Sequence, residues 1–105
     1  MEELAMYILV NQDIKISKGK LAGQVGHAVC SYVYQKGVSE DYMKAQKKII
    51  LKCPQVKLEA LENEGSITIR DLGLTHLEPN TLTCVNYGIH RKEDVPTWIK
   101  ELKLY

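Results

Sequence analysis

The sequence predicts an α/β fold, with a four-stranded mixed β-sheet and helices on both faces in a single domain over residues 1–105. The chain has the length of about one ordinary domain, and 45% of its residues are hydrophobic, which is enough for a packed core. Short apolar segments of strand character alternate with segments of helical periodicity. Their order, β-α-α-β-α-β-β-α, favours helices packed on a mixed sheet with right-handed β-α-β crossovers.

Four segments have the character of β-strands. Residues 5–10 (AMYILV) and 47–53 (KKIILKC) are apolar runs typical of strands buried on both faces, and Pro54 ends the second run. Residues 66–71 and 81–88 alternate apolar with polar side chains, as half-buried strands do. We expect these last two strands to pair with each other.

Four other segments predict helices. The longest covers residues 18–35, with Ser17 as its N-cap and Gly37 just after its end. Shorter helices are predicted at residues 39–46, 56–65 and 95–105.

The charge of the chain sets a condition on any polyanionic partner. The formal net charge is only +1, so such a partner must be bound by a local basic patch. The candidates for this patch are Lys15, Lys18, Lys44, Lys47, Lys48, Arg91 and Lys92.

The cysteines and the N-terminal segment bear on the location of the protein. Cys30, Cys53 and Cys84 are odd in number, lack CxxC spacing and lie in apolar contexts, which predicts buried, reduced thiols and a cytoplasmic protein. The first apolar run is too short to span a membrane and lacks the basic flank of a signal peptide. We therefore expect neither membrane insertion nor export.

The predicted helix at 18–35 carries a polar stripe. At 100° per residue, the side chains of Lys20, Gln24, His27 and Ser31 fall within about 60° of one another. On the residues alone, this stripe is either a solvated helix face or a functional site.

One flank of the same helix has only small residues. Gly23, Gly26 and Cys30 lie there, although each glycine costs about 1 kcal/mol of helix propensity relative to alanine. We expect something to approach this flank closely. The arc expected to face the sheet contains Leu21, Val25, Ala28, Val29 and Tyr32.

A second polar group lies where the third predicted strand ends. Asp71 comes at the strand end, Gly73 allows a tight turn, and Thr75 and Thr83 supply hydroxyls on either side of the loop. A carboxylate in this setting can orient a water molecule and take its proton. The alternative is an aspartate that caps the turn by accepting hydrogen bonds from backbone amides.

Two separated motifs in the chain match those of one known family. The pattern K-x-x-KGKxAxQxxHA is found at residues 15–28 as KISKGKLAGQVGHA, and D-x-G-x-T-x-x-x-P-x-x-x-T runs from Asp71 to Thr83. In these motifs, and essentially end to end, the chain resembles the archaeal and eukaryotic type (type 2) of peptidyl-tRNA hydrolase. It departs from the family at Thr75-His76, where T-Q is usual, and so resembles a divergent member.

The resemblance implies a metal-independent, cofactor-free hydrolase that cleaves the ester joining peptide to tRNA in peptidyl-tRNA. By the resemblance, Lys20, Asp71 and Thr83 are catalytic. Asp71 would orient or deprotonate water, Lys20 would stabilise the oxyanion or a nearby phosphate, and Thr83 would form hydrogen bonds within this group. The expected substrate-binding residues are Lys15, Lys18, Gln24, His27 and Thr75.

Two other functions stay open at this point. One is a non-catalytic RNA- or protein-binding module on the same fold, and the other is an esterase acting on a different aminoacyl-tRNA. An open cleft holding Lys20, Asp71 and Thr83 would favour the enzyme, whereas a cleft blocked by His76 or Tyr87 would favour the binding module. The expected partners are peptidyl-tRNA and, in a homodimer, a second copy of the chain, with no membrane.

Overall fold

The computed structural model has one four-stranded sheet with helices packed on it, and it describes residues 3–73 and 77–105. The elements follow one another in the predicted order, with one added 3-10 helix. They are β1 (Leu4–Asn11), α1 (Lys18–Lys36), α2 (Glu40–Ala45), β2 (Lys48–Cys53), α3 (Gln55–Asn63), β3 (Ile67–Arg70), β4 (Leu82–Arg91), η1 (Lys92–Asp94) and α4 (Thr97–Lys100).

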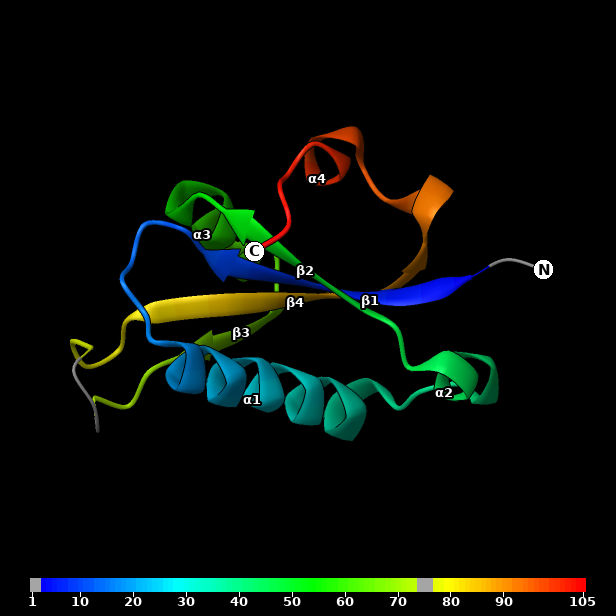
Figure 1. Cartoon of the computed structure of the whole chain (residues 1–105), viewed down its shortest axis with the longest axis horizontal. Coiled ribbons are helices and arrows are strands. Elements are labelled where there is room, and N and C mark those ends of the chain that lie inside the picture. Colours follow the sequence, from blue (N-terminus) through cyan, green and yellow to red (C-terminus); the bar gives the residue numbers. More distant parts are fainter. Residues whose placement is uncertain (1–2, 74–76) are drawn as a thin grey trace.

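The strand order of the sheet is β2-β1-β4-β3. β2 is parallel to β1, whereas β4 is antiparallel to both β1 and β3, so the predicted pairing of the last two strands is confirmed. Helices α1 and α2 cover one face and α3 and α4 the other (Figure 1). The predicted α/β fold class, a mixed sheet with helices on both faces, is confirmed.

The strand directions bring several chain segments together at one end of the sheet. β1, β2 and β3 run the same way, so all three end where β4 begins, and α1 also begins there (Figure 1). The residues that follow β3 and those that start α1 therefore lie close together. This end of the sheet carries the candidate site.

The core consists of one apolar layer on each face of the sheet. Tyr7 and Leu9 of β1 belong to the layer under α3 and α4, and Met6 and Ile8 to the layer under α1 and α2. β1 is thus buried on both faces, as predicted.

The two ends of α1 are determined by capping residues that can be recognised in the sequence. The Ser17 hydroxyl accepts a hydrogen bond from the backbone N–H of Lys20, and Gly37 follows the helix with φ of +72° and donates to the Val33 carbonyl. The predicted apolar arc does face the sheet, because it packs in the α1 layer of the core. Its residues are Leu21, Val25, Ala28, Val29 and Tyr32.

Three expectations about the elements are wrong. β2 is an edge strand with partly exposed residues, and β4 is a central strand that is buried on both faces through Asn86. The predicted helix at 95–105 is helical only at Thr97–Lys100, because the end of the chain leaves the helix and Leu104 pairs with Leu51 of β2.

The small-residue flank of α1 also differs from the expectation. A Cβ atom added at Gly23 or Gly26 would meet no atom within 4 Å, and Cys30 is exposed rather than buried. This flank faces away from the sheet, so no described residue packs against it. Cys53 and Cys84 are buried as predicted, and burial raises the pKa of their thiols to about 11 and about 12.

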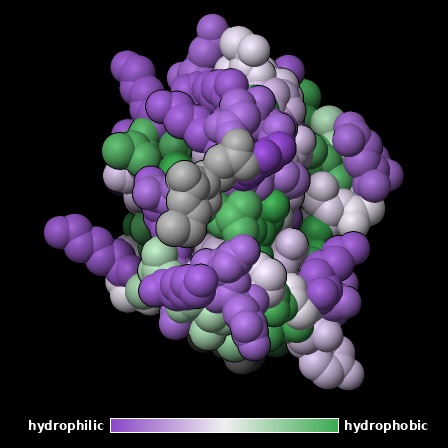
Figure 2. Space-filling model, turned by 90° about the vertical axis from the view of Figure 1, so that its right-hand side faces the viewer, coloured by the Kyte–Doolittle hydropathy of each residue, from purple (hydrophilic) through white to green (hydrophobic). Residues whose placement is uncertain are grey.

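At the end of the molecule opposite the candidate site, beside α2 and the start of β1, the surface is largely hydrophilic with scattered apolar patches (Figure 2). Among the described residues, no helix has the length and apolar character needed to cross a membrane.

Candidate active site

An open pocket of about 340 Å³ lies between α1 and the end of β3. The whole polar stripe of α1 faces it, together with Asp71, so four of the predicted site residues meet in one place. The lining residues are Lys20, Gln24, His27, Ser31, Thr68, Ile69, Arg70, Asp71 and Leu72.

An ion pair between Lys20 and Asp71 forms one wall of this pocket. The Lys20 ammonium contacts Asp71 Oδ1, with the two side chains 15% and 1% exposed. Asp71 Oδ2 accepts a hydrogen bond of 2.8 Å from the Gly73 N–H. Asp71 therefore caps the turn and also faces the pocket, so the two functions considered for it are compatible.

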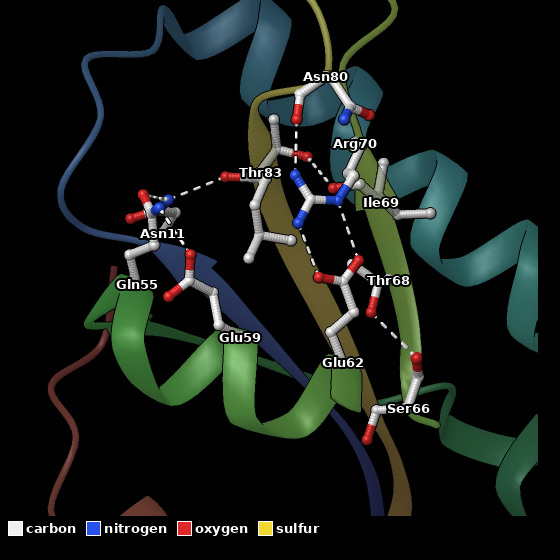
Figure 3. Close-up of polar contacts among 11 residues, drawn as sticks. Asn11, Gln55, Glu59, Glu62, Ser66, Thr68, Ile69, Arg70, Asn80 and Thr83 are labelled. Atoms are coloured by element: carbon white, nitrogen blue, oxygen red, sulfur yellow. Dashed lines mark hydrogen bonds and ion pairs between the residues drawn. The ribbon is translucent and has the colours of Figure 1, made fainter. Parts of the chain in front are cut away.

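Thr83 lies behind the pocket rather than in its lining. It is fully buried on β4, and its hydroxyl donates to Gln24 Oε1 at 2.8 Å. The same hydroxyl lies 2.9 Å from the Ile69 carbonyl (Figure 3). Gln24 stands between Thr83 and the pocket. Its Nε2 forms no hydrogen bond with any residue that the structure describes, so this amide group is left for a ligand in the pocket.

Arg70, next to Asp71 at the end of β3, connects this strand end to α3 and to Asn80. Its guanidinium donates to both carboxylate oxygens of Glu62 on α3, at 2.9 and 2.7 Å, and to the Asn80 carbonyl at 2.7 Å (Figure 3). This pairing lowers the pKa of the Glu62 carboxyl and raises the pKa of Arg70. Since Asn80 N–H also donates to the Asp71 carbonyl at 2.7 Å, both ends of the β3–β4 connection are fixed.

A buried asparagine fixes the start of β4. Asn11, the last residue of β1, donates to the Leu82 carbonyl at 2.9 Å and to the Gln55 side-chain carbonyl at 3.0 Å (Figure 3). Leu82 directly precedes Thr83, so this contact helps to hold the Thr83 hydroxyl at its place behind Gln24.

Of the remaining predicted residues, those that the structure describes lie outside this pocket. Thr75 and His76 are outside the described residues. Lys15 and Lys18 are exposed and do not line this pocket, although Lys18 lines a groove on the other side of α1. Tyr87 borders a separate cavity of about 230 Å³ and does not block the site.

The predicted basic patch is not a single surface. Lys48 lies opposite Met6 and Arg91 opposite Leu4, at the start of β1, whereas α1 begins beyond its end. About six residues of β1, at about 3.3 Å each, therefore separate Lys48 and Arg91 from the start of α1 by roughly 20 Å. Arg91 is also paired with Asp94 at 2.8 Å. Hence Lys44, Lys47, Lys48, Arg91 and Lys92 lie away from the pocket.

Four lining residues were not predicted from the sequence: Thr68, Ile69 and Arg70 of β3, and Leu72, whose side chain is 82% exposed. The signal that could have found them is their position next to Asp71 in a short strand. An edge strand beside a polar helix stripe presents its residues to the same groove.

The thiol of Cys84 is close to the site but is a poor nucleophile. Burial raises its pKa to about 12, and it donates to the Gln24 backbone carbonyl at 3.6 Å. The residues described by the structure include no group of three or more His, Cys, Asp and Glu side chains that could hold a metal ion.

Comparison with known proteins gives one consistent family. The sequence model of the family "Peptidyl-tRNA hydrolase PTH2" matches residues 4–105. The peptidyl-tRNA hydrolase of Methanopyrus kandleri is 40% identical over 110 residues, which cover 92% of this chain and 94% of that protein. Those of Haloquadratum walsbyi and Staphylothermus marinus are 39% and 35% identical, and cover 93% and 97% of this chain and 96% and 95% of their own lengths. The chain therefore belongs to the peptidyl-tRNA hydrolase PTH2 family, as its two motifs predicted.

Proposed function

We propose that this chain hydrolyses the ester bond between peptide and tRNA in peptidyl-tRNA, at the pocket between α1 and β3. The observation that carries the proposal is the buried Asp71 carboxylate, paired with the Lys20 ammonium on the wall of an open pocket. Hydrolysis of an ester needs an activated water molecule and a positive or hydrogen-bonding group for the developing oxyanion. These two side chains supply both.

In this mechanism, Asp71 acts as the general base. It holds a water molecule, takes one of its protons, and directs the oxygen at the ester carbonyl carbon. The Gly73 N–H keeps the carboxylate oriented. When the ester bond breaks, this proton passes to the leaving ribose oxygen and gives a tRNA with a free hydroxyl. The other product is the peptide's carboxylic acid, which loses the second proton of the water to solvent and becomes a carboxylate. This cycle uses only the groups of the pocket and one water molecule.

Lys20 is the electrostatic partner of the reaction. Its ammonium lies at the pocket wall beside Asp71, where it can neutralise the oxyanion or a neighbouring phosphate. The burial of Asp71 and the near burial of Lys20 strengthen this effect, since a charge interacts more strongly away from bulk water.

Other pocket residues bind the substrate. Gln24 offers the Nε2 amide to the substrate, while His27 and Leu72 are exposed at the rim, where they can contact the nucleotide or the peptide. Thr83 acts through Gln24, because it is fully buried. A binding role for Thr75 stays a prediction from the sequence.

Binding of the tRNA part uses exposed lysines near the start of α1. Lys15 and Lys18 are exposed there and can contact phosphates, so substrate binding weakens as the salt concentration rises. A homodimer and a cytoplasmic location stay predictions from the sequence, and the first can be tested by measuring the molar mass in solution.

The experiment that tests the proposal compares two substrates. Purified peptidyl-tRNA and aminoacyl-tRNA with a free amino group are incubated with the parent chain and with Asp71→Asn. Release of peptide by the parent chain, lost in the variant, would support the proposal. Binding of tRNA without release would indicate the binding module instead. Faster cleavage of the free-amino substrate would indicate the other esterase.

A further inference from the structure

A second groove, of about 710 Å³, lies on the other side of α1 from the candidate active site. Four separate segments form it: the loop after β1, the first turns of α1, edge strand β2, and the residues that follow α4. Two of its lining side chains are lysines, and none of the described lining side chains is acidic. The lining residues are Gln12, Lys18, Leu21, Lys52 and Tyr105.

The outer wall of the groove depends on how the chain end docks. The Lys52 N–H donates to the Lys103 carbonyl at 2.8 Å, and the Tyr105 N–H donates to the Ile50 carbonyl at 3.0 Å, so residues 103–105 lie along the edge of β2. The Lys52 ammonium lies 6.0 Å from the centroid of the Tyr105 ring. This cation–π contact favours a position of the ammonium at the groove.

Only the outer surface of α1 separates the groove from the active-site pocket. Lys18 lines one and Lys20 the other. Between these two lysines, on the side of the helix away from the sheet, a Cβ atom added at Gly19 or Gly23 would meet no atom within 4 Å. A bound chain can therefore cross the helix without meeting a side chain at these two positions, and a helix is only about 10 Å wide with its side chains.

We infer that this groove binds the sugar-phosphate backbone of the tRNA close to its ester-bearing end, while the ester itself lies in the pocket beside Asp71. The inference rests on the proposed function. Lys18 and Lys52 would contact phosphates, and the Tyr105 ring would pack against a ribose or a base. The closeness of the two sites and the sign of the charge both favour this occupant. Lys52 and Tyr105 thereby become substrate-binding residues.

The test uses Lys52→Ala with Lys57→Ala as a matched control. Lys57 lies on α3 at the other face of the sheet, and its ammonium is 5.3 Å from the centroid of the Trp98 ring. The control thus removes the same charge and the same kind of cation–π contact away from both the groove and the pocket. Thermal unfolding of each variant checks the fold, and Lys52→Glu provides a second, stronger change at the same exposed position.

The first measurement is equilibrium binding of deacylated tRNA over a range of salt concentrations. We expect Lys52→Ala to weaken binding several-fold and to reduce the slope of log affinity against log salt by about 1. Lys52→Glu should weaken binding further, and Lys57→Ala should match the parent chain. Equal affinities and slopes for all four proteins would overturn the inference.

The second measurement is steady-state hydrolysis of peptidyl-tRNA. Lys52→Ala should raise KM and leave kcat unchanged, since the groove contacts only the tRNA part. A loss of kcat with KM unchanged would contradict a binding role. If the parent chain released no peptide at all, the proposed function would fail, while the binding measurement on deacylated tRNA would still decide whether the groove holds the nucleic acid.

Discussion

The hydroxyl of Thr83 on the central strand β4 donates a hydrogen bond of 2.8 Å to the side-chain carbonyl of Gln24 on α1. Both residues are buried, with 0% and 5% of their surface exposed. This bond fixes which end of the Gln24 amide faces the pocket. In the proposed mechanism Thr83 would therefore act as a positioning residue through Gln24, and the catalytic role that the family resemblance implies stays a prediction.

Replacement of Thr83 tests this relationship. Thr83→Val keeps the volume but removes the hydroxyl, so the Gln24 amide loses its fixed orientation, and kcat should fall by about ten-fold, which corresponds to one hydrogen bond of about 1.4 kcal/mol. Thr83→Ser keeps the hydroxyl and should retain most of the activity. Steady-state kinetics of both variants, with thermal unfolding in parallel, give the comparison. Equal kcat values for the valine and serine variants would contradict the positioning role.

Asp71→Asn tests the general base. The variant keeps the side-chain shape but removes the basic oxygen, so turnover should fall by roughly 10² or more. Affinity for tRNA should change little, because the proposed mechanism places Asp71 beside the ester rather than at the phosphates. The measurement is kcat for peptidyl-tRNA together with the Kd for deacylated tRNA. A variant that folds normally and keeps near-parental turnover would show that Asp71 only caps the turn.

Lys18→Ala should show the opposite kinetic pattern. Lys18 is exposed near the start of α1, where it can contact phosphate but not the ester, so KM should rise while kcat is largely retained. The salt dependence of binding should also become weaker by about one unit of slope. Lys100→Ala, at an exposed lysine of α4 on the other face of the sheet, is the control. Identical salt dependence in the two variants would argue against a phosphate contact at Lys18.

Glu62→Gln tests the clamp that Arg70 makes beside the pocket. Hydrogen bonding to Arg70 lowers the pKa of Glu62, so the carboxylate stabilises the fold above its ordinary pKa of about 4.3, and this contribution is lost as the pH falls through the lower folded value. The variant should unfold at a lower temperature than the parent at pH 7. The pair is about one-third exposed, so the difference in the free energy of unfolding should stay below about 1 kcal/mol. The measurement is Tm from pH 3 to pH 7, and a difference that failed to shrink toward acid pH would contradict the ion pair.

The three thiols should differ in their reactivity. Cys30 is exposed, whereas burial raises the pKa of Cys53 to about 11 and that of Cys84 to about 12. A disulfide reagent at pH 8 should therefore modify one thiol quickly in the folded protein and all three after denaturation. Absorbance of the released leaving group counts them, and a Cys30→Ser variant should lose the fast phase. Fast reaction of a second thiol in the folded protein would contradict the packing described for β2 and β4.

Much of the fold could be predicted because its signals are local. Ser17 and Gly37 mark the ends of α1, and the apolar run of β1 needs no partner to be visible. The exposure of β2 could not be predicted in this way, because it depends on the strand order of the whole sheet. The same holds for the C-terminal segment, where pairing of Leu104 with Leu51 prevails over local helical preference.

The candidate site likewise has features that local sequence signals predict and features that they do not. The angles of Lys20, Gln24 and His27 around α1 follow from helix geometry, so their common direction could be predicted. The burial of Thr83 could not, because its partner Gln24 is 59 residues away in the chain. The predicted basic residues do not form one surface patch, for a related reason. Strand direction, which sequence composition does not reveal, decides at which end of the sheet each lysine lies.

Residues 103–105 dock on β2, so the hydrogen exchange of their amides reports whether this edge of the sheet is covered. The Lys52 and Tyr105 amides are both bonded across this edge, so their hydrogen exchange with solvent should slow together when the tail is seated and quicken together when it lifts. When residues 103–105 lift, the outer edge of β2 would lose its hydrogen-bond partners. An uncovered strand edge can pair with a strand of another molecule. Lifting of residues 103–105 would thus promote self-association of the protein and would also open one wall of the groove that Tyr105 lines.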